Sequence, residues 1–320
     1  MDRIFISVIV PAHNEQDHLA QCLQALMSQD YPKNRYEVIV VDNNSTDSTR
    51  KIALSFGVKI IDQKKGPVGA VRNVGASQAA GEFLAFIDAD CVAPKNWLSK
   101  GAHFLVKPNS VYGGGCDLPT PPHWIEQAWL LESKFPPKDL LGCCIFIKKA
   151  DFFDIGLFDE RVTSGEDTKL SKSLKKQSYN VIMTKQLNVI HLGNPATLRR
   201  FALRQVWHSE NYIQNWPETK LDPTFYLLLL FLFGLLCLFL PLGKDGIFGY
   251  LTPILLVVGT PLLFTIKRLR RSKNPKNHLR NLPFIYFLDF VYLCGRIFGL
   301  AKSTCKALKA SIARQTQLVD

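Results

Sequence analysis

The stretch FLAFIDADCV, residues 83–92, decides the fold. Its apolar residues form a short run of the kind that a fully buried β-strand shows. The run ends at Asp88 and Asp90, two carboxylates one residue apart. Paired negative charge at the mouth of a buried strand suits a divalent cation, because Mg²⁺ usually takes one or two protein carboxylates together with substrate phosphate oxygens. An isolated D-x-D is more commonly a turn with two solvated acids than a metal site. The neighbouring segments must therefore decide between these two explanations.

The sequence around this stretch alternates between strand and helix patterns. Alternation at this spacing predicts right-handed βαβ units and a largely parallel sheet, which is an α/β fold. Strands are expected at 5–10, 36–41, 58–61, 82–87 and 189–191, with an edge strand at 145–148. Helices are expected at 15–28, 47–56, 71–80, 124–131, 164–174 and 198–216.

Three of the expected strands run into polar sequence at one edge of the sheet, at PAHNE (11–15), DNNSTD (42–47) and DAD (88–90). Open parallel sheets bind ligands outside the carboxyl ends of their strands. This convergence favours a metal or ligand site over a solvated turn. No GxGxxG sequence follows the first strand, so a dinucleotide cofactor is not expected.

Several motifs occur along residues 4–195 in a definite order. They are SVIVPAHNE (7–15), VVDNNSTDST (40–49), GPVGAVRNVG (66–75), FIDAD (86–90), FDE (158–160) and GED (165–167). Each motif is weak alone, but the ordered set resembles the family 2 glycosyltransferases, which have the Rossmann-like GT-A fold. The resemblance implies a metal-dependent hexosyltransferase-type enzyme that takes its sugar from a nucleoside-diphosphate sugar.

The resemblance also implies roles for single residues. Asp90 would hold the metal, Mg²⁺ or Mn²⁺, together with Asp88 and the strand-end His191. The residues implied in binding the nucleotide sugar are Pro11, His13, Asn14, Glu15, Asp42, Arg72 and Asp88. Structural explanations stay open for several of them: Asp42 as the cap of a turn, Arg72 in a helix-surface salt bridge and His191 as a buried core histidine.

A second pair of acids, Glu166 and Asp167, begins the helix expected from residue 164. In the family an acid at the Asp167 position deprotonates the acceptor hydroxyl, and a general base must lie within hydrogen-bond reach of that oxygen. The alternative is that both acids complement the helix dipole. One base and one metal, with no nucleophile required, predict a single displacement with inversion at the anomeric carbon.

The expected helix at 198–216 carries Arg204 and Trp207. Arg204 would contact the diphosphate and Trp207 would stack on a sugar, although packing at an interface is the stronger explanation for both residues. The helix lacks the QxxRW signature of processive family members. Addition of a single sugar is therefore expected.

After Asp222 the chain changes character. Residues 225–242 and 247–266 are uncharged apolar runs, each close to the ~20 residues that a helix needs to cross a bilayer. A third apolar stretch, 282–301, contains Asp289 and Arg296 and is flanked by basic sequence. An interfacial helix is preferred there over a third span.

Basic residues gather at the same end. Of the formal net charge of +12, +10 lies in residues 267–320, where twelve Lys and Arg face only Asp289 and Asp320. A basic cluster beside apolar segments indicates a cytoplasmic loop and attraction to anionic lipid, not nucleic-acid binding. The eight cysteines include no CxxC pair, which fits reduced thiols on the cytoplasmic side.

Together these features predict a cytoplasmic catalytic domain at 1–220 and a membrane region with a basic tail at 221–320. The protein would be a multi-pass protein of the inner or plasma membrane that acts in polysaccharide biosynthesis on a lipid-linked or cell-envelope glycan. The alternatives are a nucleotidyltransferase acting on sugar phosphates and a non-catalytic membrane scaffold with a GT-A fold. The sequence leaves open the sugar, the nucleoside, the acceptor, the choice of Mg²⁺ or Mn²⁺, and the oligomeric state.

Overall fold

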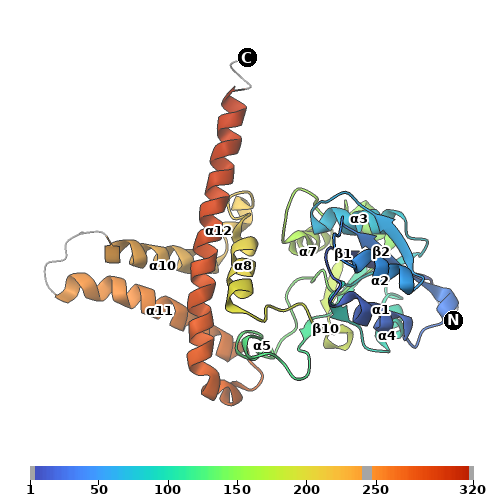
Figure 1. Cartoon of the computed structure of the whole chain (residues 1–320), viewed down its shortest axis with the longest axis horizontal. Coiled ribbons are helices and arrows are strands. Elements are labelled where there is room, and N and C mark those ends of the chain that lie inside the picture. The colour runs from blue at the N-terminus through green and yellow to red at the C-terminus, as the bar shows by residue number, and fades with distance from the viewer. Residues whose placement is uncertain (1–3, 240–246, 317–320) are drawn as a thin grey trace. The chain divides into compact units, whose positions relative to one another are not determined.

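The structure is a computed structural model that describes residues 4–239 and 247–316 (Figure 1). The chain forms two compact units. The first comprises Met1–Pro121 and Phe135–Asn194, and the second comprises Pro122–Lys134 and Pro195–Asp320. Each unit has its own apolar core.

A seven-stranded sheet forms the centre of the first unit, in the order β3-β2-β1-β4-β8-β6-β9. Its strands are β1 (Ile6–Ala12), β2 (Tyr36–Asp42), β3 (Lys59–Asp62), β4 (Phe83–Phe86), β6 (Ser110–Gly113), β8 (Ile145–Lys148) and β9 (Asn180–Met183). All neighbours pair in parallel except β8, which is antiparallel to both β4 and β6. The mostly parallel α/β sheet predicted from the sequence is confirmed.

The position predicted for β8 was wrong. It lies inside the sheet between β4 and β6, not at the edge. Ile145, Phe146 and Ile147 are all fully buried, because helices cover both faces of the sheet at this point. Three consecutive apolar residues are what a strand buried on both faces requires.

Two apolar cores lie on the two faces of this sheet. Along β1, Val8 and Val10 belong to one core and Ile9 to the other, as the two-residue period of a strand requires. The first core includes side chains of α1 (Leu19–Met27), α2 (Thr49–Ser55) and α4 (Trp97–Phe104). The second includes side chains of α3 (Val68–Ser77), α6 (Lys149–Asp154) and α7 (Glu166–Lys176).

A small second sheet has the order β5-β10-β7. Its strands are β5 (Cys91–Val92), β10 (Val189–His191) and β7 (Cys116–Asp117). β5 follows directly after the DAD sequence, and the antiparallel register places His191 opposite Cys91. The small sheet therefore brings the predicted His191 to the predicted Asp90. Single turns of 3₁₀-helix, η1 (Lys33–Arg35) and η2 (Lys185–Leu187), precede β2 and β10.

The second unit is helical. Its elements are α5 (Trp124–Trp129), α8 (Leu198–Ser209), α9 (Trp216–Thr219), α10 (Pro223–Phe239), α11 (Ile247–Arg271), η3 (Pro275–Asn281) and α12 (Leu282–Thr316). α10 and α11 run side by side, and α12 packs against α5, α8 and α11 (Figure 1). The helix expected to reach residue 216 ends at Ser209, whose side chain turns back to bond the carbonyl oxygens of Gln205 and Val206.

Two helices of the described residues are long and apolar enough to cross a membrane, namely Tyr250–Arg271 and Pro275–Lys309, while Pro223–Phe239 is shorter. This finding fits the predicted membrane anchor by length and composition. The end of the predicted 225–242 span lies outside the described residues. The expected boundary at residue 220 and the interfacial placement of 282–301 stay predictions, because both depend on which residues lie in lipid.

Candidate active site

Two loops at the carboxyl edge of the sheet hold each other in place. Asn14 donates its backbone N–H to Ser45 Oγ (3.0 Å) and accepts from Thr46 N–H through Oδ1 (2.8 Å). The φ of Asn14 is 55°, in the left-handed region that asparagine tolerates better than most residues. His13 Nδ1 donates to the carbonyl oxygen of Asn43 (2.8 Å). The PAHNE and DNNSTD sequences thus form one wall.

Two further predicted residues belong to this wall. Asp42 ends β2, is 5% exposed and accepts from Ser45 N–H (3.3 Å). This is the turn-capping contact that the sequence allowed as an alternative. Pro11 lies within β1 and is buried. The predicted nucleotide contacts of both residues stay predictions.

Arg72 lies at the centre of the predicted site. Its guanidinium, 3% exposed, donates from Nη2 to Asp88 Oδ1 and from Nη1 to Glu166 Oε1, each at 2.6 Å. Burial lowers the pKa of Arg72, but the charges of Asp88 and Glu166 outweigh it and raise the pKa overall. A Cβ at position 142 would overlap the guanidinium, so Gly142 is the residue that allows this close approach. Arg72 therefore joins the DAD turn to the start of α7, residues far apart in the sequence.

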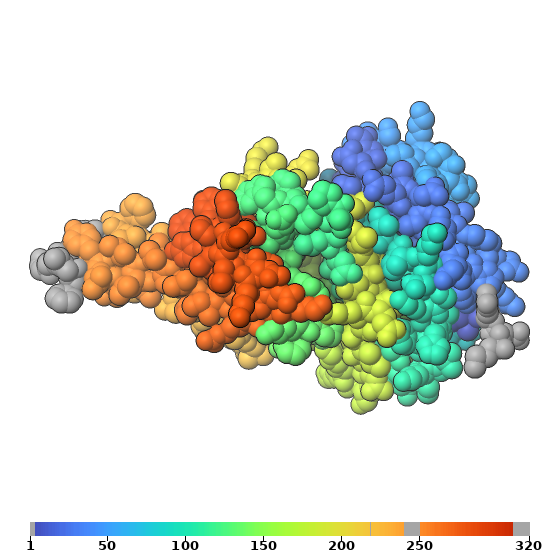
Figure 2. Space-filling model, turned by 90° about the horizontal axis from the view of Figure 1, so that it is seen from below, coloured from blue at the N-terminus to red at the C-terminus, as the bar shows by residue number. Residues whose placement is uncertain are grey.

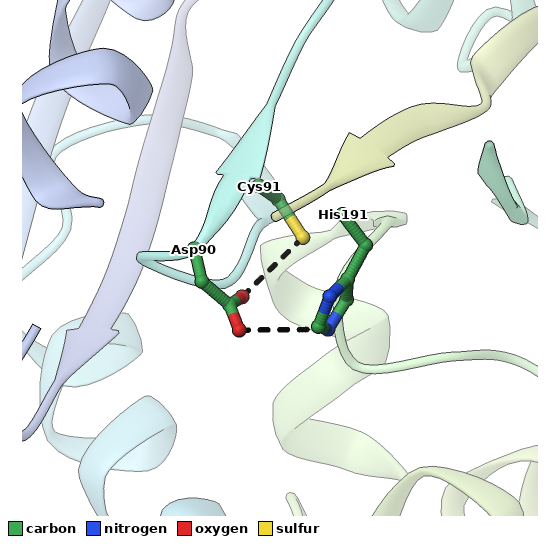
Figure 3. Close-up of side chains that lie close together, drawn as sticks. All are labelled: Asp90, Cys91 and His191. Atoms are coloured by element: carbon green, nitrogen blue, oxygen red, sulfur yellow. Dashed lines mark hydrogen bonds and ion pairs between the residues drawn. The ribbon is translucent and has the colours of Figure 1, made fainter. Parts of the chain in front are cut away.

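Asp90, Cys91 and His191 form a cluster of potential metal ligands, with one ligand atom from each within 4.8 Å of the others (Figure 3). Asp90 Oδ2 lies 3.5 Å from His191 Nε2, and Asp90 Oδ1 lies 3.6 Å from Cys91 Sγ. A hydrogen bond with Cys143 lowers the pKa of Cys91, but burial and the carboxylates of Asp88 and Asp90 raise it overall. The carboxylate and the imidazole are thus the better donors for a divalent cation, with phosphate oxygens as the remaining ligands.

A third carboxylate, that of Glu15, faces the same region. Burial raises its pKa to about 7, the charge of Asp90 adds to this, and the hydrogen bond with His18 opposes it. The carboxylates of Glu15, Asp88 and Asp90 repel one another, because this edge of the sheet holds more negative charge than Arg72 alone balances. A bound cation is the simplest way to relieve this repulsion.

The two acids at the start of α7 have different surroundings. Glu166 is 5% exposed and bonded to Arg72. Asp167 is half-buried and accepts from the N–H groups of Thr168 (2.6 Å) and Gly142 (3.1 Å). Burial raises the pKa of Asp167 to about 6, and the charge of Glu166 adds to this. Of the pair, Asp167 therefore has the properties of a base, and Glu166 those of a partner for Arg72.

The sequence analysis missed a group of cysteines beside Asp90. Cys116 Sγ lies 3.1 Å from Cys143 Sγ, and Cys143 also contacts Cys91. All three are free thiols. They come from β5, β7 and the turn before β8, so no spacing in the sequence could have grouped them. The position of Cys91 next to Asp90 was the one available signal.

Arg204 and Trp207 lie on α8, in the second unit. Trp207 is 41% exposed. Their predicted roles at the diphosphate and at the acceptor stay predictions.

Comparison with known proteins gives a family match. The family model described as Glycosyl transferase family 2 matches residues 7–130. Glycosyltransferase AglE of Haloferax volcanii is 31% identical over 213 residues, which cover 60% of this chain and 68% of that protein. The poly(ribitol-phosphate) β-N-acetylglucosaminyltransferase TarS of Staphylococcus aureus is 39% identical over 105 residues, 31% of this chain but only 18% of its own length.

A solved structure agrees in fold. The mannosyltransferase PcManGT from Pyrobaculum calidifontis, in complex with GDP-Man and Mn²⁺, has a TM-score of 0.59 at 16% identity. The match covers 92% of this chain and 88% of that one. The structural match shows the fold alone, whereas the sequence matches favour the glycosyltransferase over the nucleotidyltransferase and scaffold alternatives.

Proposed function

This chain belongs to glycosyltransferase family 2, and we propose that it transfers one sugar from a nucleoside-diphosphate sugar to a lipid-linked or cell-envelope glycan, with inversion at the anomeric carbon. A single observation carries the proposal. Arg72 bonds both Asp88 and Glu166, and so links a candidate cation site at Asp90 to a candidate base at Asp167. An inverting transfer needs these two functions on opposite sides of one sugar.

The wall formed by the PAHNE and DNNSTD loops would hold the nucleoside. Asp42, at the end of β2, is the candidate acceptor for hydrogen bonds from the base edge. The presence of GDP-Man and Mn²⁺ in PcManGT, a protein of similar fold, supports a nucleotide sugar as the donor. The identity of the nucleoside is open.

Asp90 and His191 would hold a divalent cation, Mg²⁺ or Mn²⁺, with Asp88 beside them. When bound, such an ion stabilises the negative charge that develops on the departing nucleoside diphosphate. Glu15 would add to the negative field that attracts the ion. The chain's own part is to position these donors through β5 and β10.

Asp167 would act on the acceptor. Its carboxylate takes the proton of the acceptor hydroxyl while that oxygen forms a bond to the anomeric carbon. The bond from the anomeric carbon to the diphosphate oxygen breaks, and its electron pair leaves with the nucleoside diphosphate. A pKa of about 6 leaves Asp167 ionised at neutral pH and makes it a stronger base than an ordinary aspartate.

The helices of the second unit would keep the enzyme at the cytoplasmic membrane. In this proposal α10 and α11 cross the inner or plasma membrane, α12 lies at its cytoplasmic surface, and the first unit works on the cytoplasmic side. The basic residues after α11 support this orientation. A lipid-linked acceptor would then reach the enzyme from the same membrane.

The test is sugar transfer by the full chain in detergent or nanodiscs, with UDP-, GDP- and dTDP-sugars and Mn²⁺. Asp167→Asn should lower transfer to acceptor by about 10²–10⁴, whereas Asp154→Asn, at an exposed acid on α6, should leave it intact. Full activity of the Asp167→Asn enzyme with any accepted donor would contradict the assignment of the base.

A further inference from the structure

The second unit contains a cavity of about 360 Å³. It lies between the chain after α5 and the carboxyl end of α11. Its apolar lining includes Trp129, Phe264 and Tyr292, and its basic lining is Lys267, Arg268 and Arg271. Figure 2 shows green residues of α5 and the segment that follows it against the orange and red surface of α11 and α12. The cavity thus combines aromatic walls with a cluster of cations.

Arg268 is a fixed part of the wall. Its guanidinium stacks on the ring of Trp129, 3.6 Å from the ring centroid, and donates to the Trp129 carbonyl oxygen (2.9 Å). It also donates to Asp289 Oδ1 (2.7 Å), a carboxylate that is fully buried and accepts from Thr265 as well. The charge of Arg268 is therefore already balanced inside the protein.

Lys267 and Arg271 are different. Both line the cavity, and neither forms an ion pair among the residues that the structure describes. The nearby Glu132 is paired with Lys273 at 3.1 Å, and Asp289 is paired with Arg268. Two positive charges are thus left for an anion. The Nε of Arg268 and the Oγ of Ser272 are also buried without a hydrogen-bond partner in the described chain.

The cations lie at the end of a candidate membrane span, Tyr250–Arg271. One turn earlier on α11, the side chains of Leu262, Leu263 and Ile266 are exposed. If α11 spans, the cavity lies at the level of lipid headgroups and these side chains lie in the hydrocarbon. The surroundings therefore match a ligand with an anionic head and an apolar chain.

We propose that this cavity binds the phosphate of a membrane lipid, with Lys267 and Arg271 on the phosphate oxygens and the lipid chain along Leu263, which lies one helical turn before Lys267 on the same face of α11. Two sources have this chemistry: the lipid phosphate of a lipid-linked acceptor, and the headgroup of an anionic phospholipid. Assignment to the acceptor rests on the proposed function, whereas binding of a lipid phosphate does not.

The proposal is tested by measuring binding to the full chain in nanodiscs of phosphatidylcholine, without nucleotide sugar. The probe is a fluorescent analogue of farnesyl phosphate, and the matching farnesol analogue shows the contribution of the chain alone. Lys267→Gln combined with Arg271→Gln should weaken binding of the phosphate probe at least about tenfold, since a charge-assisted hydrogen bond contributes about 1.5–3 kcal/mol. Binding of the farnesol probe should not change.

The matched control carries the same loss of charge outside the cavity, as Lys276→Gln combined with Arg280→Gln on η3. This control should bind the phosphate probe like the unaltered protein. Equal binding by the cavity variant and the unaltered protein would overturn the proposal. So would an equal loss in the control variant, because it would show general attraction of charge to the lipid surface.

Competition distinguishes the two sources. If excess phosphatidylglycerol fails to displace the farnesyl phosphate probe, the cavity selects the acceptor type of lipid phosphate. If it displaces the probe, the cavity binds phospholipid headgroups, and both results support the proposal. Failure of the proposed function is detected separately, because an Asp167→Asn enzyme should bind the probe normally even though its transfer of sugar is strongly reduced.

Discussion

Two arginines, the buried Arg72 and the half-buried Arg268, show how the two units differ. Arg72 in the first unit and Arg268 in the second each bond a carboxylate and lie near an aromatic ring, Phe158 or Trp129. Arg72 has two carboxylate partners and stands in a region with further acids, whereas Arg268 has one and stands beside further cations. The surplus charge is negative around the first and positive around the second. The same kind of side chain thus lies beside the proposed cation site in one unit and beside the proposed anion site in the other.

The largest effect is expected from a substitution of Asp167, because it tests the catalytic role proposed for the acids around Arg72. Asp167→Asn should lower kcat by about 10²–10⁴, the usual contribution of a general base. The melting temperature should fall only slightly, because the single amide oxygen of asparagine can still accept from either Thr168 or Gly142, although not from both. Asp154→Asn is the control in the same transfer assay. A kcat within a fewfold of normal would show that another group takes the proton.

The next largest effects are expected on stability, when the two arginines are replaced and thermal unfolding is measured in detergent. Arg72→Met and Arg268→Met should each reduce stability by about 3–5 kcal/mol, because each leaves a carboxylate buried without its partner. Replacing both partners by apolar residues is often neutral. Arg268→Met combined with Asp289→Leu should therefore recover most of the loss.

No single further substitution should restore the stability of Arg72→Met. Removing Glu166 still leaves the carboxylate of Asp88 without its partner, and removing Asp88 still leaves that of Glu166. Full recovery of Arg72→Met by Glu166→Leu alone would break the comparison, because it would mean that Asp88 contributes nothing.

A smaller effect is expected at Gly193, where a Cβ would overlap the carboxylate of Asp90. Gly193→Ala should displace this carboxylate and weaken activation by Mn²⁺ by about 10–100-fold, the range seen when the support of a metal ligand is disturbed. Gly156→Ala is not a suitable control because the φ of Gly156 is positive. Gly66→Ala is a suitable control, since the space around Gly66 accepts a Cβ. An unchanged Mn²⁺ dependence in Gly193→Ala would argue against Asp90 as a ligand.

The smallest effect on the rate is expected from a change of pH. The pKa of Asp167 is raised to about 6, mainly by burial, and the base must be ionised to work. The rate should therefore be constant above this pKa and fall about tenfold per unit below it. Asp167→Asn should abolish this dependence in its residual activity. A profile without a break between pH 5 and pH 7, measured at saturating Mn²⁺, would contradict the role of Asp167.

Much of the fold was predictable because its signals are local. The apolar strands β1, β2 and β4 each end in a polar sequence, and parallel strands present such ends at one edge. β8 was misplaced because its position depends on which strands it pairs with, and IFIK is compatible with an edge or an interior strand. β5 and β7, with two residues each, are too short to show any period.

The acids of the site were predictable from the sequence, but the hydrogen bonds that join them through Arg72 were not. Asp88, Asp90 and Asp167 stand at recognisable positions in the sequence. The bonds from Arg72 to Asp88 and to Glu166 join residues 16 and 94 positions apart, which no periodicity encodes. The cysteine cluster and the cavity around Arg268 arise in the same way, from segments that meet only in the folded chain.

The most direct test of the central claim is calorimetric titration of UDP and GDP into the full chain, with Mn²⁺ and with EDTA. The account predicts that one of them binds when Mn²⁺ is present, that EDTA abolishes this binding, and that Asp90→Asn abolishes it while Asp154→Asn does not. Equal binding of the same nucleotide in EDTA, or by the Asp90→Asn protein, would contradict it.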